Sequence, residues 1–127
     1  MVKKPTIIII EDDVDMAEIF EEWAKSADIS VLGVGHDGKE AVTLFEQHRP
    51  QIVVLDLMMP YFDGFYAMEN IRKIDIDAKF LVLTADITDV TKNKIESMKS
   101  ISMMYKPYDL DDVINEIKKL ASQQVLV

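Results

Sequence analysis

Short apolar runs that alternate with longer amphipathic stretches set the main constraint on how this chain can fold. Five such runs span residues 6–10, 29–34, 52–55, 80–83 and 101–105. Strands that are apolar throughout, rather than at every second residue, are typical of a sheet buried on both faces. Such sheets are parallel, with right-handed helical crossovers. The pattern predicts an α/β fold with an open sheet, since a closed barrel would need about eight such units.

The amphipathic stretches predict five helices, one after each strand. Four of them begin after an aspartate that can cap a helix, namely Asp13, Asp37, Asp63 and Asp109. The remaining stretch, residues 88–99, has a thin apolar face formed by Thr91, Ile95 and Met98. We therefore expect a helix there whose amides exchange faster than those of the first helix.

Composition fits one globular domain over residues 1–127. Apolar residues make up 49% of the chain and charged residues 29%, which is enough for a packed core. The absence of cysteine excludes disulfides and thiolate metal sites. The net charge of −9 argues against nucleic acid and anionic membranes as partners. The apolar run that ends at residue 10 is too short to span a bilayer, so we expect a cytoplasmic protein.

Groups suited to metal and phosphate chemistry follow the ends of four predicted strands. They are Glu11, Asp12 and Asp13 after the first strand, Asp56 after the third, Thr84 after the fourth and Lys106 after the fifth. Because ligands of open parallel sheets bind beyond the carboxyl ends of the strands, we expect these groups to share one site. Carboxylates without thiols favour Mg²⁺, Mn²⁺ or Ca²⁺ over zinc. A hydroxyl and an ammonium suit the oxygens of a phosphoryl group, which a carboxylate can carry covalently.

Four motifs make the chain similar to a known family. They are Ile-Ile-Glu-Asp-Asp at 9–13, Asp-Leu-Met-Met-Pro-Tyr-Phe-Asp-Gly at 56–64, Leu-Thr-Ala at 83–85 and Tyr-Lys-Pro-Tyr at 105–108. With them, the chain resembles the receiver domain of two-component response regulators, in its stand-alone CheY-like form. The resemblance implies a flavodoxin-like, doubly wound sheet of five parallel strands in the order 2-1-3-4-5, with five helices completing three layers.

The same resemblance assigns the phosphoryl acceptor and the metal ligands. Asp56 would accept the phosphoryl group. Asp12, Asp13, Asp56 and the backbone carbonyl of Met58 would hold Mg²⁺, with Mn²⁺ as a substitute and no other cofactor. Glu11 is expected to support the site or face solvent rather than to bind the metal.

The resemblance also assigns the groups that respond to phosphorylation. Thr84 would hydrogen-bond the phosphoryl group, and Lys106 would contact it as a point charge before a cis bond to Pro107. The aromatic switch residue that the family usually carries three positions before the lysine is Met103 here, and an aromatic side chain stands at Tyr105. Since residues 103 and 105 face the same side of a strand, we expect Met103 to replace the switch or Tyr105 to take part of its role.

Further positions bear on the phosphoryl lifetime and on the fourth helix. In the family, the residues at Met58 and Asp86 tune that lifetime through the access of water. An apolar Met58 should hinder attack, whereas an acidic Asp86 could aid it. The family's usual Gly-Ala before the fifth strand is Lys99-Ser100 here, which makes a left-handed backbone costlier at the end of the fourth helix.

The implied function is a signalling switch and not an enzyme, apart from catalysis of its own phosphorylation and dephosphorylation. A histidine kinase or phosphotransfer protein would donate the phosphoryl group to Asp56. The product would switch the face formed by the fourth helix, fifth strand and fifth helix. That face would bind a downstream protein or a second copy of the chain, with no role for nucleic acid or membrane.

Three alternatives stay open. A pseudo-receiver would bind partners without ever taking phosphate. A phosphatase of the haloacid dehalogenase type would use Asp56 as a nucleophile, but it needs a second aspartate where Met58 stands. A flavodoxin-like FMN carrier would need a phosphate-cradling loop where acids follow the first strand.

Overall fold

The computed structural model describes residues 3–123, which form a five-stranded parallel sheet with five helices. In chain order the elements are β1 (Thr6–Ile10), α1 (Val14–Ser26), β2 (Ser30–Gly35), α2 (Gly38–His48), β3 (Ile52–Asp56), α3 (Gly64–Ile74), β4 (Lys79–Thr84), α4 (Asp89–Glu96), β5 (Ile101–Tyr105) and α5 (Leu110–Ser122). The strands lie in the order β2-β1-β3-β4-β5. The predicted fold class and strand order are confirmed, with strand boundaries within one residue of those expected.

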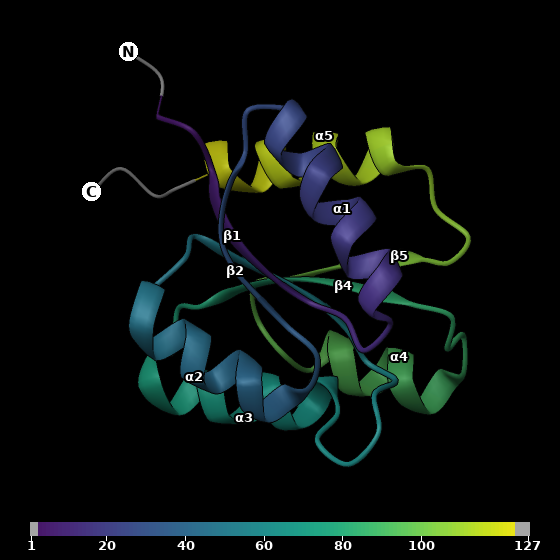
Figure 1. The fold of residues 1–127 in the computed structure, drawn as a ribbon. Coiled ribbons are helices and arrows are strands. Elements are labelled where there is room, and N and C mark those ends of the chain that lie inside the picture. The colour runs from purple at the N-terminus through teal and green to yellow at the C-terminus, as the bar shows by residue number, and fades with distance from the viewer. Residues whose placement is uncertain (1–2, 124–127) are drawn as a thin grey trace.

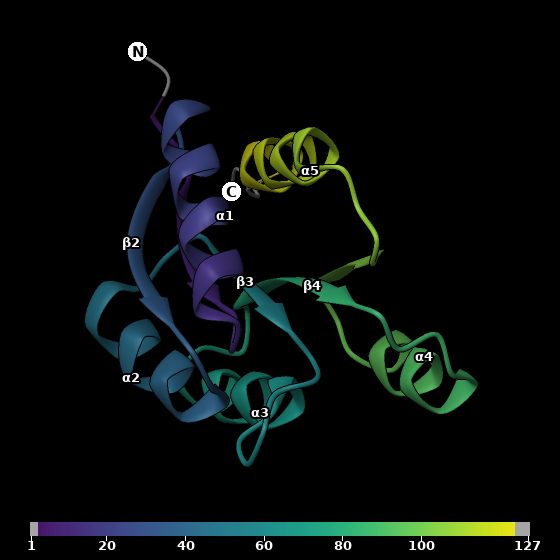
Figure 2. The same ribbon diagram turned by 45° about the vertical axis from the view of Figure 1, so that its right-hand side comes forward.

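Helices cover both faces of the sheet, as Figures 1 and 2 show: α1 and α5 lie on one face, and α2, α3 and α4 on the other. Successive residues of β1 point to opposite faces. Ile7 and Ile9 pack in the core formed with α1 and α5, whereas Ile8 and Ile10 pack in the core formed with α2, α3 and α4. All four are buried, which explains why the strand is apolar without alternation.

The predicted helix starts are confirmed. At each N-cap, an aspartate side chain accepts a backbone N–H from the first turn of the helix; the four are Asp13, Asp37, Asp63 and Asp109. Each bond satisfies a donor that a helix otherwise leaves without a partner. α4 begins in the same way after Thr88. Within residues 3–123, no helix is both long enough and apolar enough to cross a membrane.

α4 is shorter than the helix predicted over residues 88–99, because it ends at Glu96. Its buried side chains are Thr91 and Ile95, and Met98 packs against the core from the turn that follows. By contrast, α1 has 13 residues and buries Ala17, Phe20 and Ala24. Since α4 has fewer buried contacts to hold it, we expect its amides to exchange faster than those of α1 in hydrogen-exchange NMR. Equal protection of the two helices would contradict this expectation.

Ser100 joins α4 to β5 in a left-handed conformation, with a φ of 59°. This conformation costs a residue with a side chain about 1–2 kcal/mol. Phe80 N–H donates to the Ser100 carbonyl at 3.2 Å, and the Arg72 guanidinium donates to the Lys99 carbonyl, so the turn is fixed from two sides.

Ser100→Gly is therefore expected to raise the free energy of unfolding by about 0.5–1 kcal/mol, measured by urea titration, because glycine adopts this φ freely. Ser97→Gly is the matched control. Ser97 has a φ of −75°, so glycine there relieves no strain and should be destabilising. A loss of stability in Ser100→Gly would contradict the prediction.

Candidate functional site

The four strands whose ends carry reactive groups are consecutive neighbours: β1, β3, β4 and β5. Asp56 ends β3, is 7% exposed, and pairs in register with Leu83 of β4. Thr84, the next residue on β4, is fully buried and pairs with Tyr105 of β5. The backbone N–H of Lys106 donates to the Thr84 carbonyl at 2.8 Å. The structure thus brings Asp56, Thr84 and Lys106 to one edge of the sheet.

An acidic group lies at this edge. Carboxylate oxygens of Glu11, Asp12 and Asp56, one from each, all lie within 4.8 Å of one another. Asp56 is buried, Glu11 half-buried and Asp12 exposed. An all-oxygen donor set of this kind suits Mg²⁺ or Mn²⁺.

This group does not include Asp13, which was expected as a metal ligand. It does include Glu11, which was expected to lie outside the ligand set. The Asp13 carboxylate accepts the backbone N–H of Met16 at 3.1 Å and caps α1. The N–H of Glu11 donates to the Gly35 carbonyl at 3.0 Å, which continues the pairing of β1 with β2 and keeps Glu11 at the sheet edge. The cap engages one of the two carboxylate oxygens of Asp13, Oδ1.

Lys106 places a positive charge among these acids. Its Nζ lies 2.7 Å from Asp56 Oδ2 and 3.5 Å from Glu11 Oε1. Burial by itself would lower the pKa of Lys106, but the hydrogen bond with Asp56 and the attraction to both carboxylates outweigh it, so the pKa is raised. The pKa of Glu11 is raised by burial and by a hydrogen bond with Asp12, against the opposing influence of Lys106. Because the pKa of Lys106 is raised, its ammonium stays charged at neutral pH.

Asp86 is bound to the start of α4. Its Oδ1 accepts the backbone N–H of Thr88 at 2.9 Å, and its Oδ2 accepts the hydroxyl of Thr91 at 2.6 Å. These bonds lower the pKa of Asp86, and the bond from Thr91 has the largest effect. The N–H of Asp86 donates to the Thr84 hydroxyl oxygen at 3.0 Å. The carboxylate expected to influence water at the site is thus already engaged by two donors.

The other residues expected to matter lie around this edge. The N–H of Met58 donates to Asp56 Oδ1 at 3.1 Å, while its side chain is 62% exposed. Met103 is half-buried against the core on the α2, α3 and α4 side, and Tyr105 is exposed beside Thr84. The peptide bond between Lys106 and Pro107 is cis, as expected.

Tyr108 was not singled out from the sequence. Together with Glu11, Asp56 and apolar side chains, it lines a cavity of about 10 Å³ beneath the acidic group. Burial is the main cause that raises the pKa of its hydroxyl. The charge of Lys106 lowers this pKa, and the charges of Glu11 and Asp56 raise it. The sequence places it two residues after Lys106, but its approach to the acids depends on the loop into α5, which no local pattern predicts.

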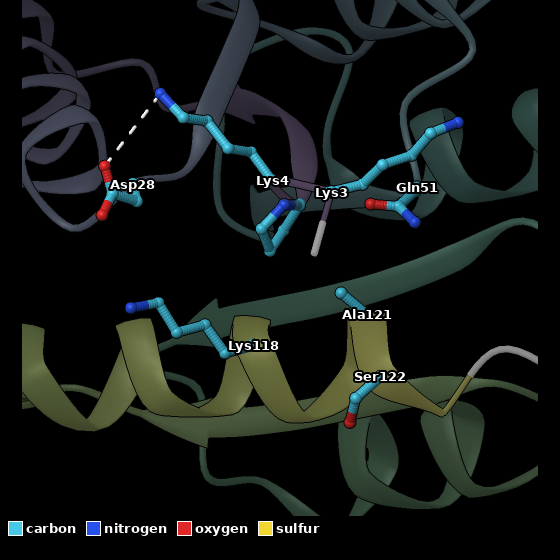
Figure 3. A pocket seen from close by; sticks show the side chains of 8 residues that line it. Lys3, Lys4, Asp28, Gln51, Lys118, Ala121 and Ser122 are labelled. Atoms are coloured by element: carbon cyan, nitrogen blue, oxygen red, sulfur yellow. Dashed lines mark ion pairs between the residues drawn. The ribbon is translucent and has the colours of Figure 1, made fainter. Parts of the chain in front are cut away.

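A larger cavity, of about 660 Å³, lies at the opposite end of the sheet (Figure 3). Lys3, Lys4 and Lys118 line it, and Lys4 pairs with Asp28 at 4.0 Å. It adjoins the amino-terminal ends of the strands, away from the acidic group. Its basic lining shares no residue with the candidate site.

Comparison with known proteins agrees with this geometry. A family model described as the response regulator receiver domain matches residues 7–118. The receiver domain of Francisella response regulator 1452 is 31% identical, with a TM-score of 0.82 over 96% of this chain and 100% of that one. A chain of the CheX–CheY–BeF₃–Mg²⁺ complex from Borrelia burgdorferi is 25% identical, with a TM-score of 0.77 over 91% of this chain and 88% of that one. Because the family model covers most of the sequence, the chain belongs to the receiver domain family of two-component response regulators.

Proposed function

We propose that Asp56 accepts a phosphoryl group from a histidine kinase or a phosphotransfer protein. The observation that carries this proposal is the 2.7 Å contact of the buried Asp56 with Lys106, beside the carboxylates of Glu11 and Asp12. Incoming phosphoryl oxygens are negative, so a carboxylate nucleophile needs positive charge close by. Lys106 supplies part of that charge from within the protein.

The acidic group fits a divalent cation that prefers oxygen ligands. Mg²⁺ is usually held by one or two carboxylates together with waters and phosphate oxygens. We propose Asp12 and Asp56 as direct ligands, with the Glu11 carboxylate close enough to join them. We propose the backbone carbonyl of Met58 as a further ligand, as the resemblance implies. Mn²⁺ has similar preferences. When bound, the cation would offset the repulsion between these carboxylates and the phosphoryl oxygens.

Transfer from a phosphohistidine requires one bond to form and one to break. An oxygen of Asp56 bonds to phosphorus while the phosphorus–nitrogen bond breaks, and the departing imidazole keeps the electron pair and takes up a proton. The Lys106 ammonium then turns from the carboxylate to a phosphoryl oxygen. Thr84 follows Leu83, the residue of β4 that pairs with Asp56, and its hydroxyl donates to a second phosphoryl oxygen. We expect turnover to be limited to the domain's own phosphoryl group.

Two faces suit protein partners. α1 begins beside the acidic group and exposes large apolar side chains, namely Val14, Met16, Ile19 and Trp23. Because exposed apolar patches next to a reactive site commonly bind proteins, we propose this helix for the phosphoryl donor. We propose the face formed by α4, β5 and α5, where Tyr105 is exposed, for a downstream protein or a second copy of the chain.

The test is intact-mass spectrometry after incubation with acetyl phosphate and Mg²⁺. The wild-type chain should gain the mass of one phosphoryl group, and EDTA should prevent the gain. Asp56→Asn should gain none, because an amide is not a nucleophile at neutral pH. Asp15→Asn, which changes an exposed carboxylate in the first turn of α1, is the matched control and should behave as wild type.

No gain in any variant, with an active receiver as positive control, would contradict the proposal and favour a pseudo-receiver. Phosphorylation of Asp56→Asn to the wild-type extent would place the acceptor elsewhere. Continuous turnover of a small phosphoester would favour the phosphatase alternative.

A further inference from the structure

The cavity at the amino-terminal end of the sheet has the size of a small-molecule site. Its volume of about 660 Å³ lies within the range of about 300–1,000 Å³ that such pockets span. The segment that leads into β1 carries Lys3 and Lys4 on one side of it, and α5 carries Lys118 on the other (Figure 3). A space bounded by two segments in this way suits a compact molecule rather than an extended peptide.

Positive charge in this cavity is only partly compensated. Three lysines line it together with one carboxylate, that of Asp28. Lys4 lies 4.0 Å from Asp28, and both side chains are largely exposed, so water weakens this pair. Among the ion pairs of residues 3–123, none involves Lys3 or Lys118. Two positive charges therefore remain available to an anion, in a chain whose net charge is −9.

The acidic group at the other end of the sheet does not cancel this charge. β1 runs between the two ends, and Glu11 stands six positions after Pro5, which lines the cavity. At about 3.3 Å per residue of a strand, the two ends lie about 20 Å apart. That distance is more than twice the Debye length of about 8 Å at physiological ionic strength. The cavity and the acidic group should therefore act on charged ligands independently.

The charge of the cavity favours a phosphate over a carboxylate. One phosphoryl group carries a charge of about −1.5 to −2 at neutral pH, which matches the two uncompensated ammonium groups. A single carboxylate would match only one of them. Lysine binds phosphate as a point charge, without the fixed geometry of an arginine fork.

The other lining groups favour an organic phosphate over a bare ion. The side-chain oxygen of Gln51 accepts the backbone N–H of Thr6 at 3.0 Å, which fixes this amide beside the cavity. Among the hydrogen bonds of residues 3–123, none uses its NH₂ group, so that group can donate to a ligand oxygen. Pro5 and Ala121 add apolar surface, which an inorganic ion would leave uncovered.

We propose that this cavity binds a soluble organic phosphate of nucleotide size. Its phosphoryl oxygens lie between Lys4 and Lys118, whose side chains extend on either side of Asp28 in Figure 3, and its apolar part lies against Pro5 and Ala121. Displacing Asp28 from Lys4 costs little, because that pair is exposed. The bound molecule joins the segment before β1 to α5, and its binding does not require a phosphoryl group on Asp56.

An NMR titration of the isotope-labelled full chain with adenosine diphosphate (ADP), in EDTA, tests the site. EDTA removes divalent cations, so that no metal can bridge the probe to the acidic group. Amide signals around Lys4, Asp28 and Lys118 should shift with a dissociation constant below about 1 mM, and those around Asp56 should not. Adenosine, which has no charge, should cause no shift. Inorganic pyrophosphate should bind more weakly than ADP, because it leaves the apolar lining uncovered.

Two neighbouring lysines of α5 provide a matched pair of variants. Lys118→Gln should weaken ADP binding by roughly fivefold, the factor expected for one exposed pair of charges in water. Lys119→Gln removes the same charge from the next residue, which is exposed and lines a different cavity. This control should bind ADP as the wild-type chain does.

Each contrary outcome has a definite meaning. The absence of shifts around Lys4 and Lys118 at millimolar ADP would overturn the site. Equal weakening in Lys118→Gln and Lys119→Gln would show only a general attraction of anions to this end of the molecule, and would also overturn it. Binding of pyrophosphate as tight as that of ADP would overturn the organic part of the proposal and leave an inorganic phosphate as the ligand.

Discussion

Gly64→Ala is expected to lower the free energy of unfolding by about 3 kcal/mol and to slow phosphorylation of Asp56. A Cβ at residue 64 would lie 2.6 Å from the Asp56 carbonyl oxygen and 2.7 Å from the Leu57 Cα. Both atoms belong to the backbone and cannot rotate away, so the loop after β3 or the start of α3 must shift. The N–H of Gly64 also donates to the Leu57 carbonyl at 3.0 Å, and the shift would strain that bond.

Urea unfolding together with the acetyl phosphate assay measures both effects. Gly33→Ala is the matched control, because the nearest atom to its new Cβ is Leu44 Cδ2 at 2.9 Å, the end of a flexible side chain. That methyl can move, so Gly33→Ala should change stability by less than about 1 kcal/mol. Equal losses in the two variants would show that close approach to the backbone of Asp56 is not the reason for glycine at 64.

The fold was predictable because its causes are local and repeated. Buried parallel strands are apolar at every position, and an aspartate before a helix marks its start, so both kinds of element were recognisable before any contact was known. The end of α4 was placed three residues too late, because its thin apolar face gives weak periodicity. The turn through Ser100 depends on Arg72 and Phe80, which are distant in sequence.

The composition of the site was harder to predict than its position. Three acids in succession follow β1, and which of them face the site depends on where the chain leaves the strand and enters α1. The structure shows the Asp13 carboxylate capping α1 through Oδ1, whereas the three acids whose oxygens converge are Glu11, Asp12 and Asp56. The partners of Asp86 depend on a loop conformation that the sequence alone does not specify.

Lys106→Met is expected to weaken the metal-free fold and to strengthen Mg²⁺ binding, while slowing phosphorylation more than tenfold. Without the ammonium, the buried Asp56 loses its 2.7 Å partner and faces Glu11 and Asp12 uncompensated. Because the side chain of Lys106 is 31% exposed, water offsets part of the cost, and we expect a loss of about 1–2 kcal/mol in the free energy of unfolding. Removing a positive charge beside the metal site should tighten Mg²⁺ binding by about tenfold.

Lys106→Met should thus lower the free energy of unfolding, measured by urea titration in EDTA, and raise the affinity for Mg²⁺, measured by titration calorimetry. Since the pKa of Lys106 is raised in the folded state, its stabilising contribution is complete below the ordinary lysine range and is lost only as the pH rises through the folded value. The stability difference between variant and wild type should therefore be constant across neutral pH. Lys25→Met, which removes an exposed ion pair with Glu21 at 2.9 Å on α1, should change stability by less than about 0.5 kcal/mol and leave Mg²⁺ binding unaltered. If Lys106→Met bound Mg²⁺ more weakly, the ammonium would be supporting the metal ligands rather than competing with the cation for them.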